Sequence, residues 1–117
     1  SSCEKDEGKL PNISFKTTAG YTAADKTVAA GDTIVVGINA SKSEEEDVLK
    51  TFNISKSVDG ASSTTVQTIT LSAAQEDTYS QDFSLVAGSA GHTEKYTFTV
   101  SNRDGLTNSV NFTLTVQ

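Results

Sequence analysis

Acidic side chains in three short stretches are the first residues of this chain whose types could do chemistry. They are Glu44, Glu45, Glu46 and Asp47, then Glu76 and Asp77, and finally Asp104. Ca²⁺ takes about six to eight oxygen ligands from clustered carboxylates and carbonyls, so the set is a candidate cation site or a contact for a basic partner. A solvated face has the same composition, and the spacing matches no EF-hand loop. We therefore expect no resident metal or cofactor, with Ca²⁺ as the alternative.

Catalytic chemistry has few candidate groups. The chain has one histidine, His92, in a Gly- and Ser-rich stretch, and one cysteine, Cys3. A zinc site needs several His or Cys ligands, and Ser and Asp are too abundant here for a Ser-His-Asp triad to be selected from sequence. We expect that the protein is not an enzyme and has no catalytic residues.

Recognition of a partner has two candidate residues. Sugar-binding faces usually present exposed aromatic side chains, and Tyr21 is the only aromatic residue outside the strands expected below. Tyr21 and His92 are therefore candidate contacts for a protein or glycan partner. The nine Lys and Arg residues are scattered singly in a chain of net charge −6, a pattern that excludes nucleic acid as a partner.

The elements that must position these residues are β-strands. Apolar residues recur with a period of two between turn signals, as in an antiparallel sandwich or barrel. The expected strands are Asn12 to Thr17, Thr33 to Asn39, Thr51 to Val58, Thr64 to Leu71, Thr78 to Leu85, Glu94 to Asn102 and Leu106 to Val116. The 117 residues suffice for one core, so we expect a flexible segment at 1–10 and one monomeric domain at 11–117.

Turn and bulge signals refine this pattern. A change of parity between Val66 and Ile69 predicts a β-bulge near Gln67. The sequence Asn102-Arg103-Asp104-Gly105 predicts the turn of a hairpin that joins the last two strands.

Two connections carry signals for the start of a helix. Ser43 with Glu46 and Ser72 with Gln75 both match the Ser-x-x-Glu/Gln capping box. Each is expected to begin one helical turn.

Seven short strands that end in a hairpin resemble the immunoglobulin-like sandwich of bacterial surface proteins and of the PKD and cadherin-like families. Tyr96-Thr97-Phe98 stands where an immunoglobulin domain has its corner tyrosine two residues before the second disulfide cysteine, and Phe98 replaces that cysteine. The third strand has no Trp, so Phe52 or Ile54 is expected to pack there. The resemblance implies an all-β, Ig-like antiparallel β-sandwich with Greek-key connections.

An Ig-like topology also implies two different ends. It would gather the acidic residues at the end where the first strand begins. The opposite end would carry the segment Thr18 to Asp32, the Asp59-Gly60 turn and the loop Val86 to Thr93, with Tyr21 and His92 among them.

Cys3 allows three interpretations: a free or intermolecular thiol, an incidental surface residue, or an acylated residue. Ser1-Ser2-Cys3 resembles the end of a lipobox, and Glu4-Lys5-Asp6-Glu7 resembles the export signal of surface lipoproteins from Bacteroides-type bacteria. The resemblance implies lipid on Cys3 and an outer-membrane lipoprotein of the cell envelope that is exposed at the cell surface. Attachment to the membrane would be through that lipid, because no apolar run approaches the roughly 20 residues that cross a bilayer.

Asp32-Thr33-Ile34 resembles the O-glycosylation motif of envelope proteins from the same bacteria, so Thr33 is a candidate modification site. Together these features favour a noncatalytic cell-envelope module for adhesion or for assembly with another surface component. A passive spacer that supports another domain and a glycan-binding module are the alternatives.

Overall fold

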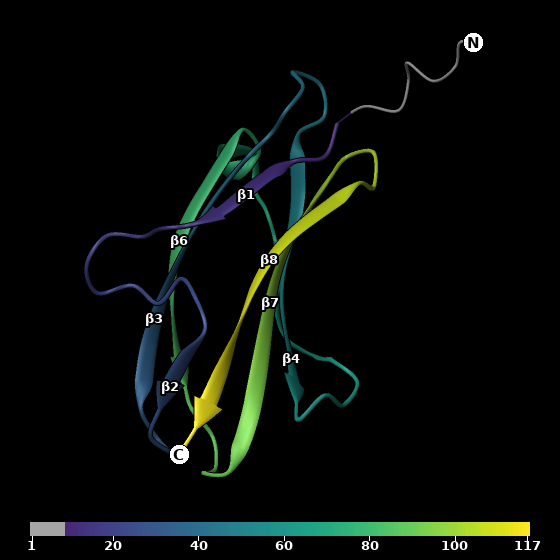
Figure 1. The fold of residues 1–117 in the computed structure, drawn as a ribbon. Coiled ribbons are helices and arrows are strands. Elements are labelled where there is room, and N and C mark those ends of the chain that lie inside the picture. Colours follow the sequence, from purple (N-terminus) through teal and green to yellow (C-terminus); the bar gives the residue numbers. More distant parts are fainter. Residues whose placement is uncertain (1–8) are drawn as a thin grey trace.

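The computed structural model describes residues 9–117, which form two facing β-sheets (Figure 1). One sheet has the strand order β1-β3-β6 and the other the order β2-β8-β7-β4-β5. The strands are β1 (Asn12–Phe15), β2 (Lys26–Val28), β3 (Thr33–Ser41), β4 (Leu49–Val58), β5 (Thr64–Thr70), β6 (Thr78–Val86), β7 (His92–Asn102) and β8 (Thr107–Val116). The prediction of an all-β sandwich is confirmed.

Two predictions concern the part of the chain before residue 9. Cys3 and most of the segment 1–10 lie outside the described residues. Within residues 9–117, no helix has the length and apolar character needed to span a membrane.

β2 is the strand that the sequence pattern did not predict. Its residues Lys26–Val28 pair in parallel with Leu114–Val116 of β8, whereas the other strand pairs are antiparallel. Three residues are too few to show an alternation, and the pairing depends on a segment far along the chain. The expectation of a wholly antiparallel sandwich is therefore wrong at this pair.

Aromatic side chains from both sheets fill the core. Phe98 of β7 is fully buried, and its ring centroid lies 5.7 Å from that of Phe112 and 5.5 Å from that of Phe15. Phe52 of β4 is also fully buried and stacks on Phe83 of the facing sheet at 5.3 Å. These positions confirm that Phe98 and Phe52 face inward, as the alternation predicted.

The predicted bulge in β5 is confirmed one residue from its expected position. Ile54 of β4 pairs with Gln67, and the next residue, Ser55, pairs with Thr65. Val66 is therefore the extra residue on β5, which explains why the parity of its apolar residues changes.

One of the two predicted helical turns forms. The 3₁₀ helix η2 (Ala73–Gln75) begins after Ser72, whose backbone N–H donates to Oε1 of Gln75 at 2.9 Å. The other prediction is wrong, since residues 43–48 contain a turn and no helix. The hydroxyl of Ser43 donates to the carbonyl oxygen of Leu10, so the N-terminal segment takes the group that a capping box would use.

The predicted hairpin between β7 and β8 is confirmed. Asn102 is buried, and its Oδ1 accepts hydrogen bonds from the N–H groups of Asp104 and Leu106, both at 3.0 Å. Gly105 has a φ of 84°, a left-handed conformation that glycine adopts without steric cost.

Truncation of Phe98 to alanine tests the position of the core. We expect Phe98→Ala to lower the free energy of unfolding by about 3–5 kcal/mol, because it leaves a cavity between the sheets. Phe15→Ala is the matched control at a half-buried position and should cost less. Urea unfolding followed by circular dichroism measures both. A loss at Phe98 no larger than that at Phe15 would contradict the central place of Phe98.

Candidate functional site

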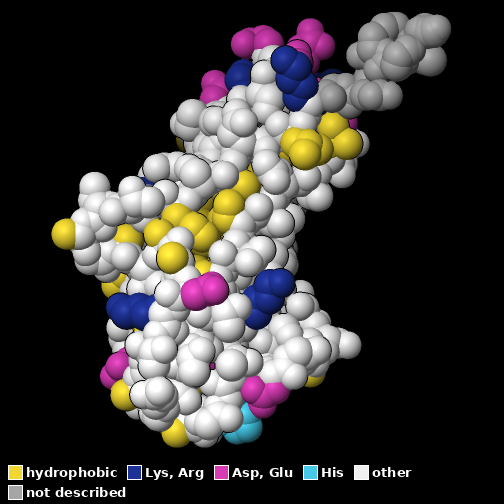
Figure 2. Space-filling model, viewed as in Figure 1, with side chains coloured by type: hydrophobic (Ala, Val, Ile, Leu, Met, Phe, Trp, Pro, Cys, Tyr) yellow, Lys and Arg dark blue, Asp and Glu magenta, His cyan; other side chains and the backbone are white. Residues whose placement is uncertain are grey.

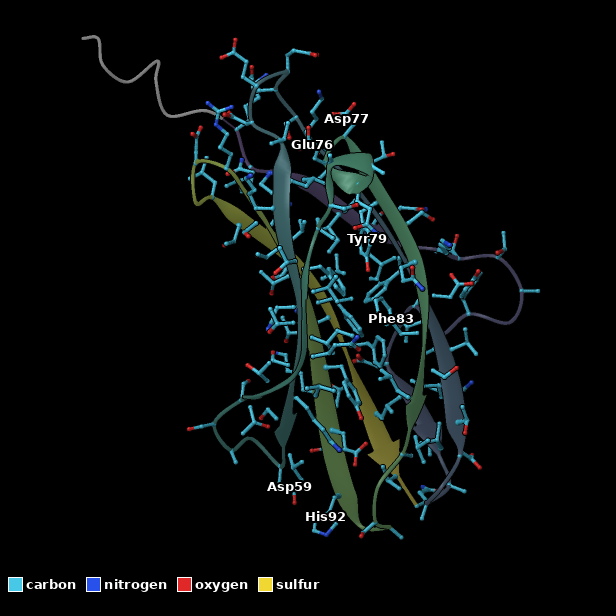
Figure 3. All side chains as sticks on the ribbon, turned by 180° about the vertical axis from the view of Figure 1, so that it is seen from behind. Asp59, Glu76, Asp77, Tyr79, Phe83 and His92 are labelled. Carbon is cyan, nitrogen blue, oxygen red and sulfur yellow. The ribbon has the colours of Figure 1, made fainter. Side chains whose placement is uncertain are left out.

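The two ends of the sandwich carry different side chains (Figures 2 and 3). Asp and Glu side chains gather where the N-terminal segment meets the sheets, while the histidine lies at the far end. Glu76 and Asp77 lie at the first end, and Asp59 and His92 lie at the second. The first end, here called the acidic end, comprises Glu44, Glu45, Glu46, Asp47, Glu76, Asp77 and Asp104.

Basic side chains are interleaved with the carboxylates of the acidic end. Lys42 Nζ lies 2.9 Å from Asp77 Oδ1 and 3.5 Å from Glu45 Oε2, and Lys9 Nζ lies 3.7 Å from Glu44 Oε2. Across residues 9–117, no three His, Cys, Asp or Glu side chains are grouped in a way that could hold a metal ion. Three of the seven carboxylates of the acidic end, those of Glu44, Glu45 and Asp77, therefore lie beside a lysine.

The pKa of Asp47 is raised by its neighbours at the acidic end. The hydrogen bond with Asp104 raises the pKa of Asp47, and partial burial and the charge of Glu44 act in the same direction. Because the folded pKa lies above the unfolded value, ionisation of Asp47 at neutral pH opposes folding. That opposition disappears as the pH falls below the folded pKa.

Tyr21 does not lie at the far end, so the prediction that it shares this end with His92 is wrong. Its hydroxyl donates to Asp82 Oδ2 at 2.9 Å, and Lys16 Nζ donates to Asp82 Oδ1 at 2.8 Å. Both side chains cover Gly37 in the middle of β3, where a Cβ would lie 2.5 Å from Lys16 Cδ and 2.6 Å from Tyr21 Cε1. The segment between β1 and β2 thus crosses the outside of the three-stranded sheet.

This contact shifts two pKa values in opposite directions. The hydrogen bonds from Lys16 and Tyr21 lower the pKa of Asp82, and the same carboxylate raises the pKa of Tyr21. The Tyr21 hydroxyl is therefore engaged within the protein, which makes Tyr21 a structural residue of the loop.

His92 lies at the far end, as predicted, and contacts a residue that the sequence did not single out for chemistry. Its Nδ1 lies 2.5 Å from Asp59 Oδ2, and the N–H of Thr93 donates to Asp59 Oδ1 at 2.8 Å. The hydrogen bonds with His92 and Thr93 lower the pKa of Asp59. Asp59 itself has a φ of 53° and precedes Gly60 in the turn after β4.

A cleft of about 290 Å³ opens beside His92. We call it the distal cleft. It is lined by Lys56, Val58, Gly88, Ser89, His92 and Glu94. The residues come from β4, from β7 and from the loop that joins β6 to β7. The cleft therefore depends on two neighbouring strands and on the loop that covers their ends.

Glu94 gives the distal cleft its chemistry. Its side chain is only 3% exposed, and Oε2 accepts the N–H of Gly88 at 3.0 Å and lies 3.5 Å from Lys56 Nζ. Oε1 is buried and has no hydrogen-bond partner among the described residues. A Cβ on Gly88 would lie 2.5 Å from Oε2, so a larger residue at this position would require the Glu94 side chain to shift. Glu94 thus brings to the lining of the cleft a carboxylate with one unpaired oxygen, which is itself buried.

Sequence reasoning missed Glu94 and Lys56, although a signal was present. Glu94 has the inward parity of Tyr96 and Phe98 in β7, and Lys56 has the inward parity of Ile54 in β4. A charged residue at an inward position of a strand needs a buried partner. Both strands break their apolar pattern at the same end, where the cleft lies.

A wider depression of about 540 Å³ runs along β1, β3 and β6. Most of the side chains that line it are uncharged Asn, Ser and Thr: Asn12, Ser14, Asn39, Ser41, Thr78, Ser80 and Asn108. None of the residues that line this depression is charged, and their hydrogen-bond donors and acceptors lie on an open surface.

The predicted modification site, Thr33, is the exposed first residue of β3. The neighbouring Asp32 accepts the N–H of Ala29 through its side chain at 3.0 Å. Glycosylation of Thr33 stays a prediction.

Comparison with known proteins adds information on the fold. No protein-family model matches this chain, and no curated protein matches its sequence. Its structure is similar to the crystal structure of the sporulation control protein Spo0M from Bacillus subtilis, with a TM-score of 0.58 and 8% sequence identity. The match covers 93% of this chain and 50% of that chain, so this chain spans about half the length of Spo0M. At such low identity the likeness supports the β-sandwich architecture alone.

The contact between His92 and Asp59 predicts an unusual titration. The pKa of Asp59 should lie below the ordinary value of about 3.9 and should rise toward it in His92→Leu. Stability from this contact is present above the unfolded pKa and is lost as the pH falls through the folded pKa. Carboxyl-detected NMR titration measures the value. Thr93→Val, which keeps the backbone N–H, is the control and should leave the pKa of Asp59 low. An unchanged pKa in His92→Leu would contradict the contact.

Proposed function

We propose that this protein is a noncatalytic cell-envelope module, held at the outer membrane through lipid on Cys3, that mediates adhesion or assembly with another surface component. The difference between the two ends of the sandwich is the observation that carries this proposal. The N-terminal segment meets the acidic end, where Lys9 pairs with Glu44 and Leu10 accepts the hydroxyl of Ser43. Lipid on Cys3 would hold the acidic end toward the membrane and direct the distal cleft away from it.

We also infer that the sandwich is Ig-like. In support, the β7–β8 hairpin and β4 are neighbours in one sheet, and β3 and β6 are neighbours in the other. Phe98 is buried at the position expected for a disulfide cysteine, and Phe52 packs in the third expected strand. The short parallel strand β2 beside β8 is an addition to the pattern predicted from sequence.

Lipid attachment is testable on the full-length precursor in a Bacteroides-type host. We expect the protein to incorporate labelled palmitate and to fractionate with the outer membrane, and Cys3→Ser to lose both properties, because the chain has no other cysteine. Ser2→Ala keeps a small residue before the cysteine and is the matched control. Palmitate in Cys3→Ser, or none in the unaltered protein, would contradict the anchor.

Glycan binding at the distal cleft is a second candidate function, favoured by the unpaired Oε1 of Glu94. The cleft offers a carboxylate acceptor, the donor Nζ of Lys56 and the apolar side chain of Val58. An anionic ligand would meet the carboxylate of Glu94, and a cationic ligand would meet Lys56. A neutral ligand with several hydroxyl groups avoids both repulsions, and it can donate to Oε1 once the buried Glu94 side chain turns toward the cleft. A passive spacer, in contrast, has no use for such a cleft.

Titration of the protein with neutral monosaccharides tests this second function. We expect amide NMR shifts at Gly88 and Ser89, and an affinity about tenfold lower for Glu94→Gln, because a hydrogen bond to a charged group contributes about 1.5–3 kcal/mol. Glu46→Gln at the acidic end makes the same chemical change at an exposed site and should bind normally. Shifts at neither residue across a panel of neutral sugars, or equal affinity in Glu94→Gln, would rule out sugar binding at the cleft.

A further inference from the structure

β5 forms an outer edge of the five-stranded sheet and pairs only with β4. Every residue of Thr64–Thr70 is exposed except Ile69, which is half-buried, and Val66 is 47% exposed. The outward N–H and C=O groups of an edge strand have no partner in their own sheet and can pair with another strand. β5 therefore presents a free strand edge to solvent.

This edge lacks the charges that commonly protect edge strands from pairing. The sequence from Ala61 to Gln75 contains no charged residue and no proline. The other outer strands are short or charged: β1 has four residues, β2 has three and includes Lys26, and β6 carries Asp82 at its middle. Short strands and charged side chains both disfavour pairing between chains. The protection of β5 is limited to the bulge at Val66.

We propose that β5 pairs in antiparallel fashion with β5 of a second copy of this chain, across a two-fold axis that joins the two five-stranded sheets. The segment Gln67–Thr70 lies beyond the bulge and pairs regularly with β4. In the dimer, Thr68 would lie opposite Thr68 of the second copy, and Gln67 opposite Ile69, because a two-fold axis pairs residues that face the same side of the sheet. Three of the four residues from Gln67 to Thr70 are β-branched, the type that packs well across neighbouring strands.

The distribution of charge favours a second copy of the chain as the partner, in the antiparallel orientation. Each chain has a net charge of −6, so two copies repel each other except where their surfaces are neutral, as along β5. Antiparallel pairing places the two acidic ends at opposite ends of the joined sheet. Parallel pairing would set them side by side. A two-fold axis also lets one short segment supply both halves of the contact.

With this pairing the protein would be a dimer and not the monomer expected from the sequence. A second copy of the chain would then be the partner in the proposed adhesion. Its place in adhesion rests on that proposed function, whereas association in solution does not require the lipid. Failure of palmitate labelling would leave the strand pairing standing, and failure of self-association would leave the anchor standing.

Sedimentation equilibrium of the 117-residue protein, under reducing conditions that prevent disulfides through Cys3, tests the pairing. We expect the mean mass to rise from 12.3 kDa toward twice that value as the concentration approaches about 1 mM, the range of weak specific contacts. Thr68→Lys places like charges on both sides of the axis and should abolish the rise. Ser109→Lys adds the same charge on β8, away from the edge, and should dimerise like the unaltered protein.

Hydrogen exchange gives a second measurement on the same samples. The amides of Gln67–Thr70 should exchange more slowly at high concentration in the unaltered protein, and this slowing should vanish in Thr68→Lys. A monomeric mass at every concentration overturns the proposal. The partner of the β5 edge would then be an extended segment of another protein. A rise in mass that Thr68→Lys does not alter also overturns it, because the contact would then lie elsewhere. Circular dichroism of both Lys variants establishes that the fold is kept.

Discussion

Packing of aromatic rings between the two sheets is the interaction on which the rest of this structure depends. The only cysteine of the chain is Cys3, so no disulfide joins the sheets over residues 9–117. Phe98 instead contacts Phe15, Phe52 and Phe112 at the centre of the sandwich. Burial of one such side chain contributes about 1.5–3 kcal/mol. The loops at both ends take their positions from this packing, because no disulfide and no group of candidate metal ligands joins the sheets within the described chain.

Glu94 is the one charged residue among the buried residues of 9–117. A buried carboxylate is costly unless it is paired, and Lys56 and the N–H of Gly88 pair with only one of its two oxygens. Glu94 thereby fixes the loop between β6 and β7 over the end of the sheet, where a hydrophobic residue could not hold a backbone N–H. Local departures from good packing of this kind are expected at functional sites. The same departure defines the distal cleft.

The sequence predicted the elements whose pattern is complete within one strand. The alternation in β3, β4, β7 and β8 is independent of distant contacts, and even the bulge at Val66 left a change of parity. Predictions failed where a distant segment decides the outcome: β2 needs β8, the hydroxyl of Ser43 binds Leu10, and Tyr21 is drawn to a carboxylate on β6. The distal cleft was not predicted, although the inward position of Glu94 was a signal for it. The shape of the cleft depends on the geometry of a loop, which period-two patterns do not encode.

The parallel pairing of β2 with β8 has a mechanical consequence. The chain enters at the acidic end, and β8 leads to Gln117 at the opposite end (Figure 1). Tension between the two ends would pull β2 and β8 along their length in opposite directions. Their interstrand hydrogen bonds, from Lys26–Leu114 to Val28–Val116, would then bear the load together in shear and would not open one at a time. A strand of three residues thus gives the sandwich a clamp against stretching.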